Sequence, residues 1–363
     1  LMKTVVIGGG PSGLISAYFR ANRGEDVLLI EKNEKLGKKL YITGKGRCNV
    51  TNDCDEEEFL SNVVSNPRFL NGAIRRFPPE KFMEFLEEKV RLKTERGNRV
   101  FPLSDKASDI TGCLESYARG AGAKIRLNEK VLSVNARDGE IYSVTTDKEE
   151  IACDNVIVCT GGISYPSTGS DGDGYRFAEK LGHTIIKPVP ALSGLNLKGD
   201  FYKNLQGVTL KNVALTVYNG EKKVYSDFGE VLFTHFGISG PTFISASSYI
   251  NRLDLSNVSV SIDLKPALSF EQLDLRVLRD FGKYKNKALK NSLDDLLLKS
   301  LIPEVIKLAK INGDVKNNEL KSEDRKKLVN TIKDMRMYPY SLRDISEAIV
   351  TAGGVSVKEI NPK

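Results

Sequence analysis

A glycine-rich turn between two apolar runs, near the start of the chain, is the sequence feature that most constrains the fold. Residues 4–7 form a short β-branched run that predicts a buried parallel strand. Residues 14–23 have a helical pattern, and residues 27–30 predict a second strand, which ends at Glu31. A strand, a glycine turn, a helix and a second strand in this order predict the βαβ unit of an α/β fold.

The spacing of the glycines in the turn predicts a dinucleotide site. Gly8, Gly10 and Gly13 form the pattern G-x-G-x-x-G. The first allows the tight turn, the second lets the backbone approach a pyrophosphate, and the third lets the helix pack closely on the strand. Pro11 suits the first helical turn, and Ser12 follows it in the same turn. The N-terminus of this helix would stabilise the charge of a phosphate.

Glu31 lies about 20 residues beyond the turn, where a carboxylate accepts hydrogen bonds from the adenosine ribose. A carboxylate in this place disfavours a 2′-phosphate. The sequence therefore predicts FAD or NAD rather than NADP.

A long basic loop, residues 32–52, follows Glu31. Structureless loops of this length in a compact domain are usually functional. We expect backbone N–H groups near Gly44 and Gly46, with Arg47 or Lys39, to face phosphate or a flavin ring. A lysine-rich surface turn is the structural alternative.

The next part of the chain predicts helices over residues 56–90 and a helix that Asp105 or Ser108 caps. Residues 155–159 then predict an apolar strand that runs directly into Thr160-Gly161-Gly162. Small residues at the carboxyl end of a parallel strand lie where ligands approach an open α/β sheet. A second glycine-rich loop, residues 164–175, lacks the G-x-G-x-x-G spacing, so we expect a single adenine nucleotide.

Changes of pattern along the 363 residues predict three parts. Pro188 and Pro190 mark a boundary, after which residues 207–233 are mostly β-like, and residues 270–335 are helical and basic. We therefore expect an FAD-binding domain at residues 1–190 and 351–363, a β-rich substrate domain at residues 191–265 and 336–350, and a helical insertion at residues 266–335.

Composition excludes several classes of protein. No stretch approaches the roughly 20 apolar residues of a membrane helix, and the first residues lack the pattern of a signal peptide. The five cysteines include no C-x-x-C, which argues against a dithiol redox centre or a zinc ribbon. With His183 and His235 alone, a histidine-based metal site is not expected. We expect a cytoplasmic protein with no membrane partner, no metal and an undetermined oligomeric state.

The net charge of +7 comes largely from lysines between residues 283 and 333. Solvated lysines on helix surfaces are the favoured explanation, so we do not expect a nucleic-acid partner. The sequence shows no interleaving of basic and aromatic residues and no known RNA-binding module. An FAD-dependent RNA-modifying or RNA-binding protein is kept as an alternative.

Several motifs together resemble one family of flavoproteins. They are the glycine turn, Glu31 with Lys32, and residues 44–52, 99–106, 160–169, 232–241 and 353–355. The combination is similar to the BaiN and aminoacetone-oxidase-like family of bacterial NAD(P)/FAD-dependent oxidoreductases. The resemblance implies an α/β fold with a glutathione-reductase-like Rossmann FAD-binding domain, a β-rich second domain and a small helical insertion. Family chains continue past residues 353–355 into a strand and an acidic motif that contact FAD, so we expect part of the cofactor cradle to be missing from this sequence.

The resemblance also implies that the loop at residues 44–52 borders the flavin and that Val131 and residues 160–162 line the cofactor. Cys48 is better explained as a small packed residue than as a covalent flavin tether or redox partner. The complete set of expected FAD-binding residues is Gly8, Gly10, Pro11, Ser12, Gly13, Glu31, Lys32, Lys39, Gly44, Gly46, Arg47, Cys48, Asn49, Val131, Thr160, Gly161 and Gly162.

The leading functional hypothesis is hydride transfer between a small organic substrate and FAD, because the flavin carries the redox chemistry in such enzymes. Either O2 or NAD(P)H would complete the cycle, which leaves oxidase and reductase open. Tyr165 and His235 are the candidate substrate-contacting residues, although a structural role is slightly favoured for each. An NAD-dependent dehydrogenase is a second alternative, but it leaves the loop at residues 44–52 without a role.

Overall fold

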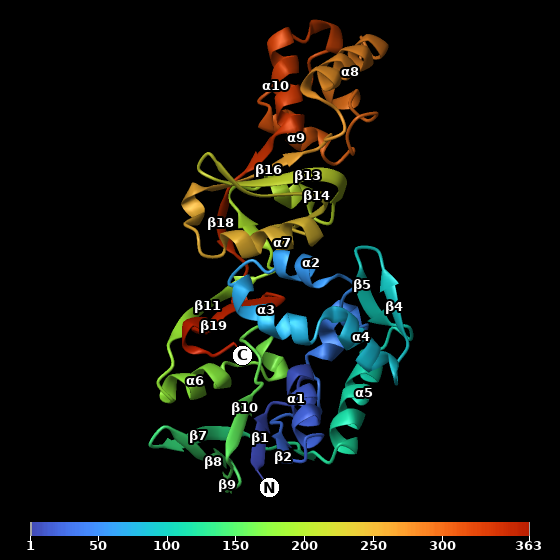
Figure 1. Ribbon diagram of the computed structural model, residues 1–363. Coiled ribbons are helices and arrows are strands. Elements are labelled where there is room, and N and C mark those ends of the chain that lie inside the picture. Colours follow the sequence, from blue (N-terminus) through green and yellow to red (C-terminus); the bar gives the residue numbers. More distant parts are fainter. Residues whose placement is uncertain (1, 363) are drawn as a thin grey trace. The chain divides into compact units, whose positions relative to one another are not determined.

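The computed structural model describes residues 2–362, and the chain divides into two compact units (Figure 1). Unit 1 comprises residues 1–188 and 353–363, and unit 2 comprises residues 189–352. The chain passes from one unit to the other in strands β11 (Ile185–Ala191) and β19 (Val350–Val355), which pair with each other.

Unit 1 is built on a parallel sheet of four strands in the order β10-β1-β2-β6. The elements are β1 (Lys3–Ile7), α1 (Pro11–Ala21), β2 (Asp26–Ile30), β6 (Lys124–Arg126) and β10 (Asn155–Val158). Strands β1 and β2 are buried over all but their first residue, as expected for central parallel strands. Helix α1 provides the crossover that two adjacent parallel strands need, so the predicted βαβ unit is confirmed.

Successive side chains of β1 and β2 face two different hydrophobic cores. Val6 and Leu29 pack with Leu14 of α1 and Leu114 of α5 (Ala107–Gly120). On the other side, their neighbours pack against Phe177 of α6 (Asp173–Lys180) and against an antiparallel sheet. That sheet consists of β7 (Val131–Arg137), β8 (Glu140–Thr146) and β9 (Glu150–Ala152). The sheet is therefore covered on both faces, which fixes its carboxyl edge as the open side.

The remaining elements of unit 1 are three short helices and a small antiparallel sheet. They are β3 (Thr51–Asn52), α2 (Glu56–Ser61), α3 (Pro67–Arg76), α4 (Pro79–Glu87), β4 (Leu92–Glu95) and β5 (Arg99–Pro102). The expected cap of α5 is wrong, because Lys106 occupies the N-cap position and no side chain caps the helix. Asp105 instead has a left-handed φ of 56° and accepts from Lys93 at 2.7 Å.

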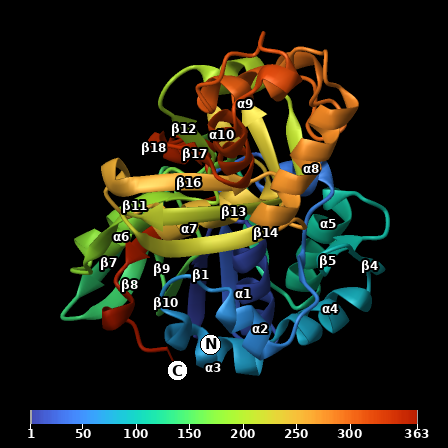
Figure 2. The same cartoon turned by 90° about the horizontal axis from the view of Figure 1, so that it is seen from above.

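Unit 2 contains an antiparallel sheet of seven strands in the order β17-β16-β13-β14-β15-β12-β18. Its strands are β12 (Leu195–Leu197), β13 (Thr209–Asn219), β14 (Lys222–Thr234), β15 (Gly237–Ser239), β16 (Val258–Asp263), β17 (Met335–Met337) and β18 (Pro339–Leu342). Figure 2 shows β16, β13 and β14 side by side. The β13–β14 hairpin turns at Asn219-Gly220, where Gly220 has a φ of 58°.

The helices of unit 2 share one core with this sheet. They are α7 (Pro241–Ile250), α8 (Phe270–Lys283), α9 (Ile302–Leu308) and α10 (Ser322–Lys333). Leu273 and Val277 of α8 and Leu328 of α10 are buried in the same cluster as Val217 and Val260 of the sheet. The helical segment at residues 266–335 is therefore part of the compact unit that contains the β-rich strands.

Candidate functional site

The glycine turn brings the N-terminus of α1 to the carboxyl edge of the parallel sheet. Gly8 has a φ of 107°, and a Cβ there would lie 2.4 Å from the carbonyl oxygen of Cys159. A Cβ at Gly13 would lie 1.9 Å from the carbonyl oxygen of Gly8, so only glycine lets α1 pack this closely. A Cβ at Gly10 would meet no atom within 4 Å. The middle glycine therefore faces open space.

The first turn of α1 is free to receive an anion. Gly10 is its N-cap residue, no side chain caps it, and its first turn contains no acidic residue. Pro11 occupies the first helical position, where it removes an N–H that would be unpaired. The remaining N–H groups and the helix dipole favour negative charge at this point.

Glu31 is buried at the end of β2 and fixes the turn beside it. Its Oε2 accepts from the backbone N–H of Gly9 at 2.6 Å. Its Oε1 accepts from the backbone N–H of Asn33 at 2.8 Å and from Asn33 Nδ2 at 2.7 Å. These bonds orient the carboxylate toward the cavity, while Oε2, which accepts a single bond, retains acceptor capacity for a ribose hydroxyl.

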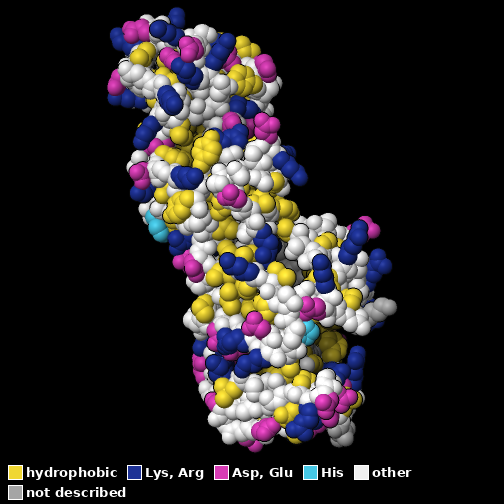
Figure 3. Space-filling view, turned by 90° about the vertical axis from the view of Figure 1, so that its left-hand side faces the viewer, with side chains coloured by type: hydrophobic (Ala, Val, Ile, Leu, Met, Phe, Trp, Pro, Cys, Tyr) yellow, Lys and Arg dark blue, Asp and Glu magenta, His cyan; other side chains and the backbone are white. Residues whose placement is uncertain are grey.

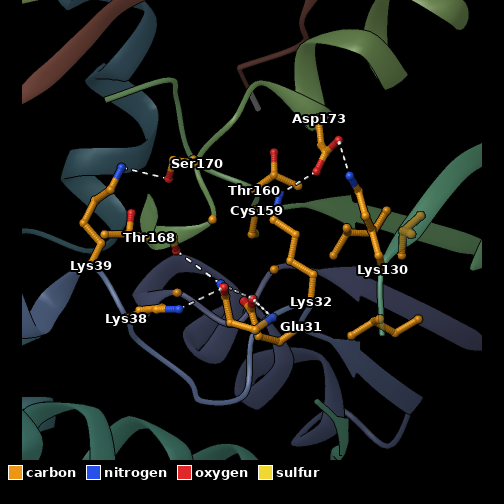
Figure 4. Close-up of a pocket in the computed structure, with 18 of the residues that line it drawn as sticks. Glu31, Lys32, Lys38, Lys39, Lys130, Cys159, Thr160, Thr168, Ser170 and Asp173 are labelled. Carbon is orange, nitrogen blue, oxygen red and sulfur yellow. Dashed lines mark hydrogen bonds and ion pairs between the residues drawn. The ribbon is translucent and has the colours of Figure 1, made fainter. Parts of the chain in front are cut away.

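A cavity of about 240 Å³ lies in front of these groups (Figure 4). The predicted cofactor residues that line it are Gly8, Gly10, Pro11, Ser12, Glu31, Lys32, Lys39, Val131, Thr160 and Gly161. Residues from four separated segments of the sequence thus meet at one place. Whole small-molecule pockets span about 300–1,000 Å³. The cavity therefore has the size expected for a part of a dinucleotide rather than for all of it.

The second glycine-rich loop forms one wall of this cavity, which the sequence alone did not predict. Thr168, Gly169, Ser170 and Asp173 all line it. The carbonyl oxygen of Thr168 accepts from Asn33 Nδ2 at 3.2 Å, and a Cβ at Gly169 would lie 2.5 Å from that nitrogen. The glycine density of the loop was the available signal. Its role was missed because the spacing did not match a phosphate-binding motif.

Four further lining residues were also missed: Asn33, Lys38, Glu129 and Lys130. Each lies next to a predicted element in the sequence, yet none belongs to a motif. Lys130 approaches the carboxylate of Asp173 at 3.9 Å, as Figure 4 shows. These side chains can be recognised only when the β2 and β7 strand ends are placed together.

Lys39 is the lysine of the cavity that is best placed to meet a phosphate. Its Nζ donates to the carbonyl oxygen of Ser164 at 2.9 Å and to Ser170 Oγ at 2.8 Å. Within residues 2–362 it forms no ion pair with a carboxylate, so its charge is not compensated. Burial lowers the pKa of Lys39. An anionic ligand would relieve this cost of burial.

Lys32, in contrast, already has two carboxylate partners across the cavity. Its Nζ lies 2.7 Å from Asp173 and 2.8 Å from Asp171. Burial alone would raise the pKa of Asp171, but the hydrogen bond from Lys32, with a smaller contribution from Asp173, lowers it to about 2. The pair ties the end of β2 to the second glycine-rich loop.

Replacing Lys32 by methionine is expected to lower the free energy of unfolding by about 1 kcal/mol at pH 7, after allowance for solvent screening of Asp171. The pKa of Asp171 is depressed in the folded state, so its contribution is present above about pH 4 and is lost as the pH falls toward 2. Urea unfolding at pH 7 and pH 3 measures the effect. Lys38→Met, which breaks an exposed pair with Glu34, is the control and should change little. An equal difference between Lys32→Met and wild type at both pH values would contradict the assignment.

The loop at residues 43–49 does not line the cavity. Gly44, Lys45, Gly46 and Cys48 all have φ between 55° and 88°. Arg47 stacks on Phe101 with its Cζ 4.1 Å from the ring centroid. The loop therefore turns repeatedly through left-handed backbone.

Ion pairs and burial hold this loop. Arg47 pairs with Glu95 at 2.8 Å and with Asp105 at 3.4 Å. Cys48 is buried in the core of α1 and α5, where burial raises the pKa of its thiol. A raised pKa disfavours the reactive thiolate. Contact of the flavin with Gly44, Gly46, Arg47, Cys48, Asn49 and Gly162 remains a prediction.

The two candidate catalytic residues belong to different units. Tyr165 is exposed, has a left-handed φ of 48°, and its carbonyl oxygen accepts from the Thr168 hydroxyl at 2.7 Å. It does not line the cavity, although its loop does. His235 is exposed between β14 and β15, with its ring against Phe236 at 5.0 Å. Both roles remain predictions.

The described part of the chain contains neither a candidate metal site nor a helix that could cross a membrane. Among residues 2–362, no group of three or more His, Cys, Asp or Glu side chains is arranged to hold a metal ion. Over the same residues, no helix combines the length and the apolar character needed to cross a membrane.

The cavity residues fit the adenylate half of FAD. Gly10 leaves room for a pyrophosphate, the uncapped α1 N-terminus and Lys39 supply positive charge, and Glu31 supplies the acceptor for the ribose. These features, on a parallel sheet with a β-rich second unit, define a Rossmann-type dinucleotide-binding protein. A family model described as the HI0933-like protein Rossmann domain matches residues 2–363, and the chain belongs to this family. It is an FAD-binding oxidoreductase of the α/β class.

The chain is similar over nearly its whole length to two characterised proteins. It is 28% identical to 3-dehydro-bile acid delta(4,6)-reductase of Clostridium scindens, with 98% of this chain and 87% of the relative covered. It is 30% identical to the ribosomal RNA dihydrouridine synthase of Escherichia coli, with 99% and 86% covered. A solved structure, the open conformation of a flavocytochrome c3 fumarate reductase, aligns with 98% of this chain and 67% of its own at 15% identity and a TM-score of 0.44.

Proposed function

We propose that the protein is an FAD-dependent reductase that saturates a carbon–carbon double bond conjugated to a carbonyl group, with NAD(P)H as electron donor. The observation that carries the proposal is that two full-length relatives, one acting on a bile acid and one on a uridine base, are both named for adding hydrogen across such a bond. An oxidase that uses O2 is the less favoured reading.

The chain's own residues bind and orient the cofactor. The α1 N-terminus and Lys39 would hold the phosphates, and Glu31, itself fixed by Gly9 and Asn33, would hold the ribose. Thr168 and Ser170 would form one wall beside this half of the cofactor. Bound FAD supplies the hydride transfer.

The overall reaction balances with the proposed donor. One molecule of NAD(P)H is oxidised, a hydride is added to one carbon of the double bond, and a proton is added to the other. The substrate would meet the flavin beyond the cavity described above. Tyr165 and His235 remain the proposed residues for substrate contact. All five cysteines are unpaired, which supports the proposal of a reducing cytoplasmic compartment.

Anaerobic reduction of the FAD-loaded protein tests the proposal. We expect NADH or NADPH to bleach the visible flavin absorbance, and a steroid enone or a uridine-containing oligonucleotide to restore it without O2. Primary amines should not bleach the flavin. Bleaching by an amine together with no response to either nicotinamide would contradict the reductase and support the oxidase.

A further inference from the structure

One face of the sheet in unit 2 is turned away from the hydrophobic core. Along β13, β16 and β17, alternate residues are buried in the core: Leu215, Val217, Val260, Ile262, Met335 and Met337. The residues between them share the opposite face. In register, Tyr218 pairs with Ser259, and Ser261 pairs with Arg336. This outer face is polar, except for its tyrosines.

A tyrosine ring and an arginine lie together on this face. The Cζ of Arg336 is 4.7 Å from the ring centroid of Tyr218, and its Nη1 donates to Ser259 Oγ at 3.0 Å. Asp334 accepts from the same guanidinium at 2.7 Å and so fixes its orientation. Tyr338 and Tyr340 follow along the chain and are 56% and 60% exposed. Large aromatic side chains left this open lack the partner that normally buries them.

Lysines border these rings. Lys223 is exposed and pairs in register with Tyr218, and Lys222 precedes it. The backbone N–H of Lys198 donates to the carbonyl oxygen of Tyr338 at 2.8 Å. Within residues 2–362, neither Lys222 nor Lys223 has a carboxylate at ion-pair distance. We call Tyr218, Lys223, Arg336, Tyr338 and Tyr340 the basic–aromatic surface.

The neighbouring helical segment adds a positive field to unit 2. Residues 265–336 contain 17 Lys and Arg against 11 Asp and Glu. Figure 3 shows side chains of the hydrophobic class, in yellow, beside Lys and Arg, in dark blue, on one face at the height of β16 and β18 in Figure 1. Such a field attracts a polyanion and speeds its encounter.

We propose that the basic–aromatic surface binds a single-stranded segment of RNA. Its bases would stack on Tyr338 and Tyr340, and a phosphate would meet Lys223, since every base has a π-face and aromatic sheet surfaces are a common RNA platform. In this role the surface would present a uridine substrate within the RNA, so the inference rests on the proposed double-bond reduction. From the sequence alone we predicted no interleaving of basic and aromatic residues. This prediction is wrong for residues 336–340, which contain one basic and two aromatic residues at alternate positions.

Fluorescence anisotropy with a labelled single-stranded RNA of mixed sequence tests the proposal on the full chain. We expect Tyr338→Ala/Tyr340→Ala to weaken binding about thirty-fold, from the loss of two stacked bases. Lys223→Gln should weaken it less and lower the log–log salt dependence by about 0.7. The matched control is Tyr142→Ala in unit 1, an exposed tyrosine that also lies beneath an arginine and should leave binding unchanged.

Several outcomes would overturn the proposal. They are no RNA binding at low salt, equal loss in the Tyr142 variant, unchanged binding in the double variant, or equal binding of DNA of the same sequence. Thermal unfolding of each variant shows that it is folded. RNA binding needs neither bound FAD nor turnover, and flavin bleaching by NAD(P)H is measured on the same variants. A failure of this surface can therefore be told apart from a failure of the reductase proposal.

Discussion

Gly10→Ala is expected to weaken FAD binding about 100-fold, or about 2.7 kcal/mol, while the apoprotein is at least as stable as wild type. Gly10 has a φ of −75° and a ψ of −180°, which any L-residue adopts, and its Cβ would meet no protein atom within 4 Å. Alanine there is even expected to stabilise the apoprotein by about 0.4–1 kcal/mol, because it restricts the unfolded chain. The added methyl group instead fills the space that the pyrophosphate needs.

Gly13→Ala is the matched comparison, because the same methyl group is added one helical turn further on. Its Cβ would lie 1.9 Å from the carbonyl oxygen of Gly8, a backbone atom of the glycine turn. We expect a loss of about 3 kcal/mol or more in unfolding free energy, together with loss of FAD binding. Fluorescence titration with FAD and urea unfolding of the apoprotein separate the two effects. Unchanged FAD affinity in Gly10→Ala would show that the phosphates do not approach this turn.

The first βαβ unit could be predicted from sequence because each of its constraints is local. Gly13 is required by a contact within the turn, and Gly8 by its left-handed φ of 107°, although a Cβ at Gly8 would also meet the distant carbonyl oxygen of Cys159. The apolar runs are long enough to identify buried strands. Glu31 could be found by its distance from the turn along the chain. Its bonds to Gly9 and Asn33 could not, since they depend on how the end of β2 folds back.

The rest of the cavity depends on contacts that are distant in sequence. Lys39 meets Ser164 and Ser170 more than a hundred residues away, and no periodicity encodes such a contact. The same limit applies in unit 2, where Tyr218 lies beneath Arg336 through the pairing of β13, β16 and β17. Residue types indicated which loops and strands could contribute side chains to a site. The register of the sheets determines which of these side chains meet.

Glu31→Ala should produce the largest combined loss of stability and cofactor affinity. The carboxylate accepts three hydrogen bonds, from the backbone N–H of Gly9 and from two nitrogens of Asn33, at 2.6–2.8 Å. Removing it leaves these donors without an acceptor in a buried site. We expect the free energy of unfolding to fall by about 2–4 kcal/mol, since an unsatisfied buried donor costs about 1–3 kcal/mol.

The affinity for FAD should fall in parallel, by about 100-fold, because the ribose loses its acceptor while the turn loses its support. Glu31→Gln retains the shape and one acceptor oxygen, so its loss should be intermediate. Glu34→Ala is the control, since its carboxylate is 60% exposed and pairs only with Lys38 at 3.2 Å, and a change within about 0.5 kcal/mol is expected. Urea unfolding and FAD titration of the three variants provide the measurements. If Glu31→Ala behaved like Glu34→Ala in both, the carboxylate would neither hold the turn nor receive the ribose, and the dinucleotide would have to bind elsewhere on the sheet.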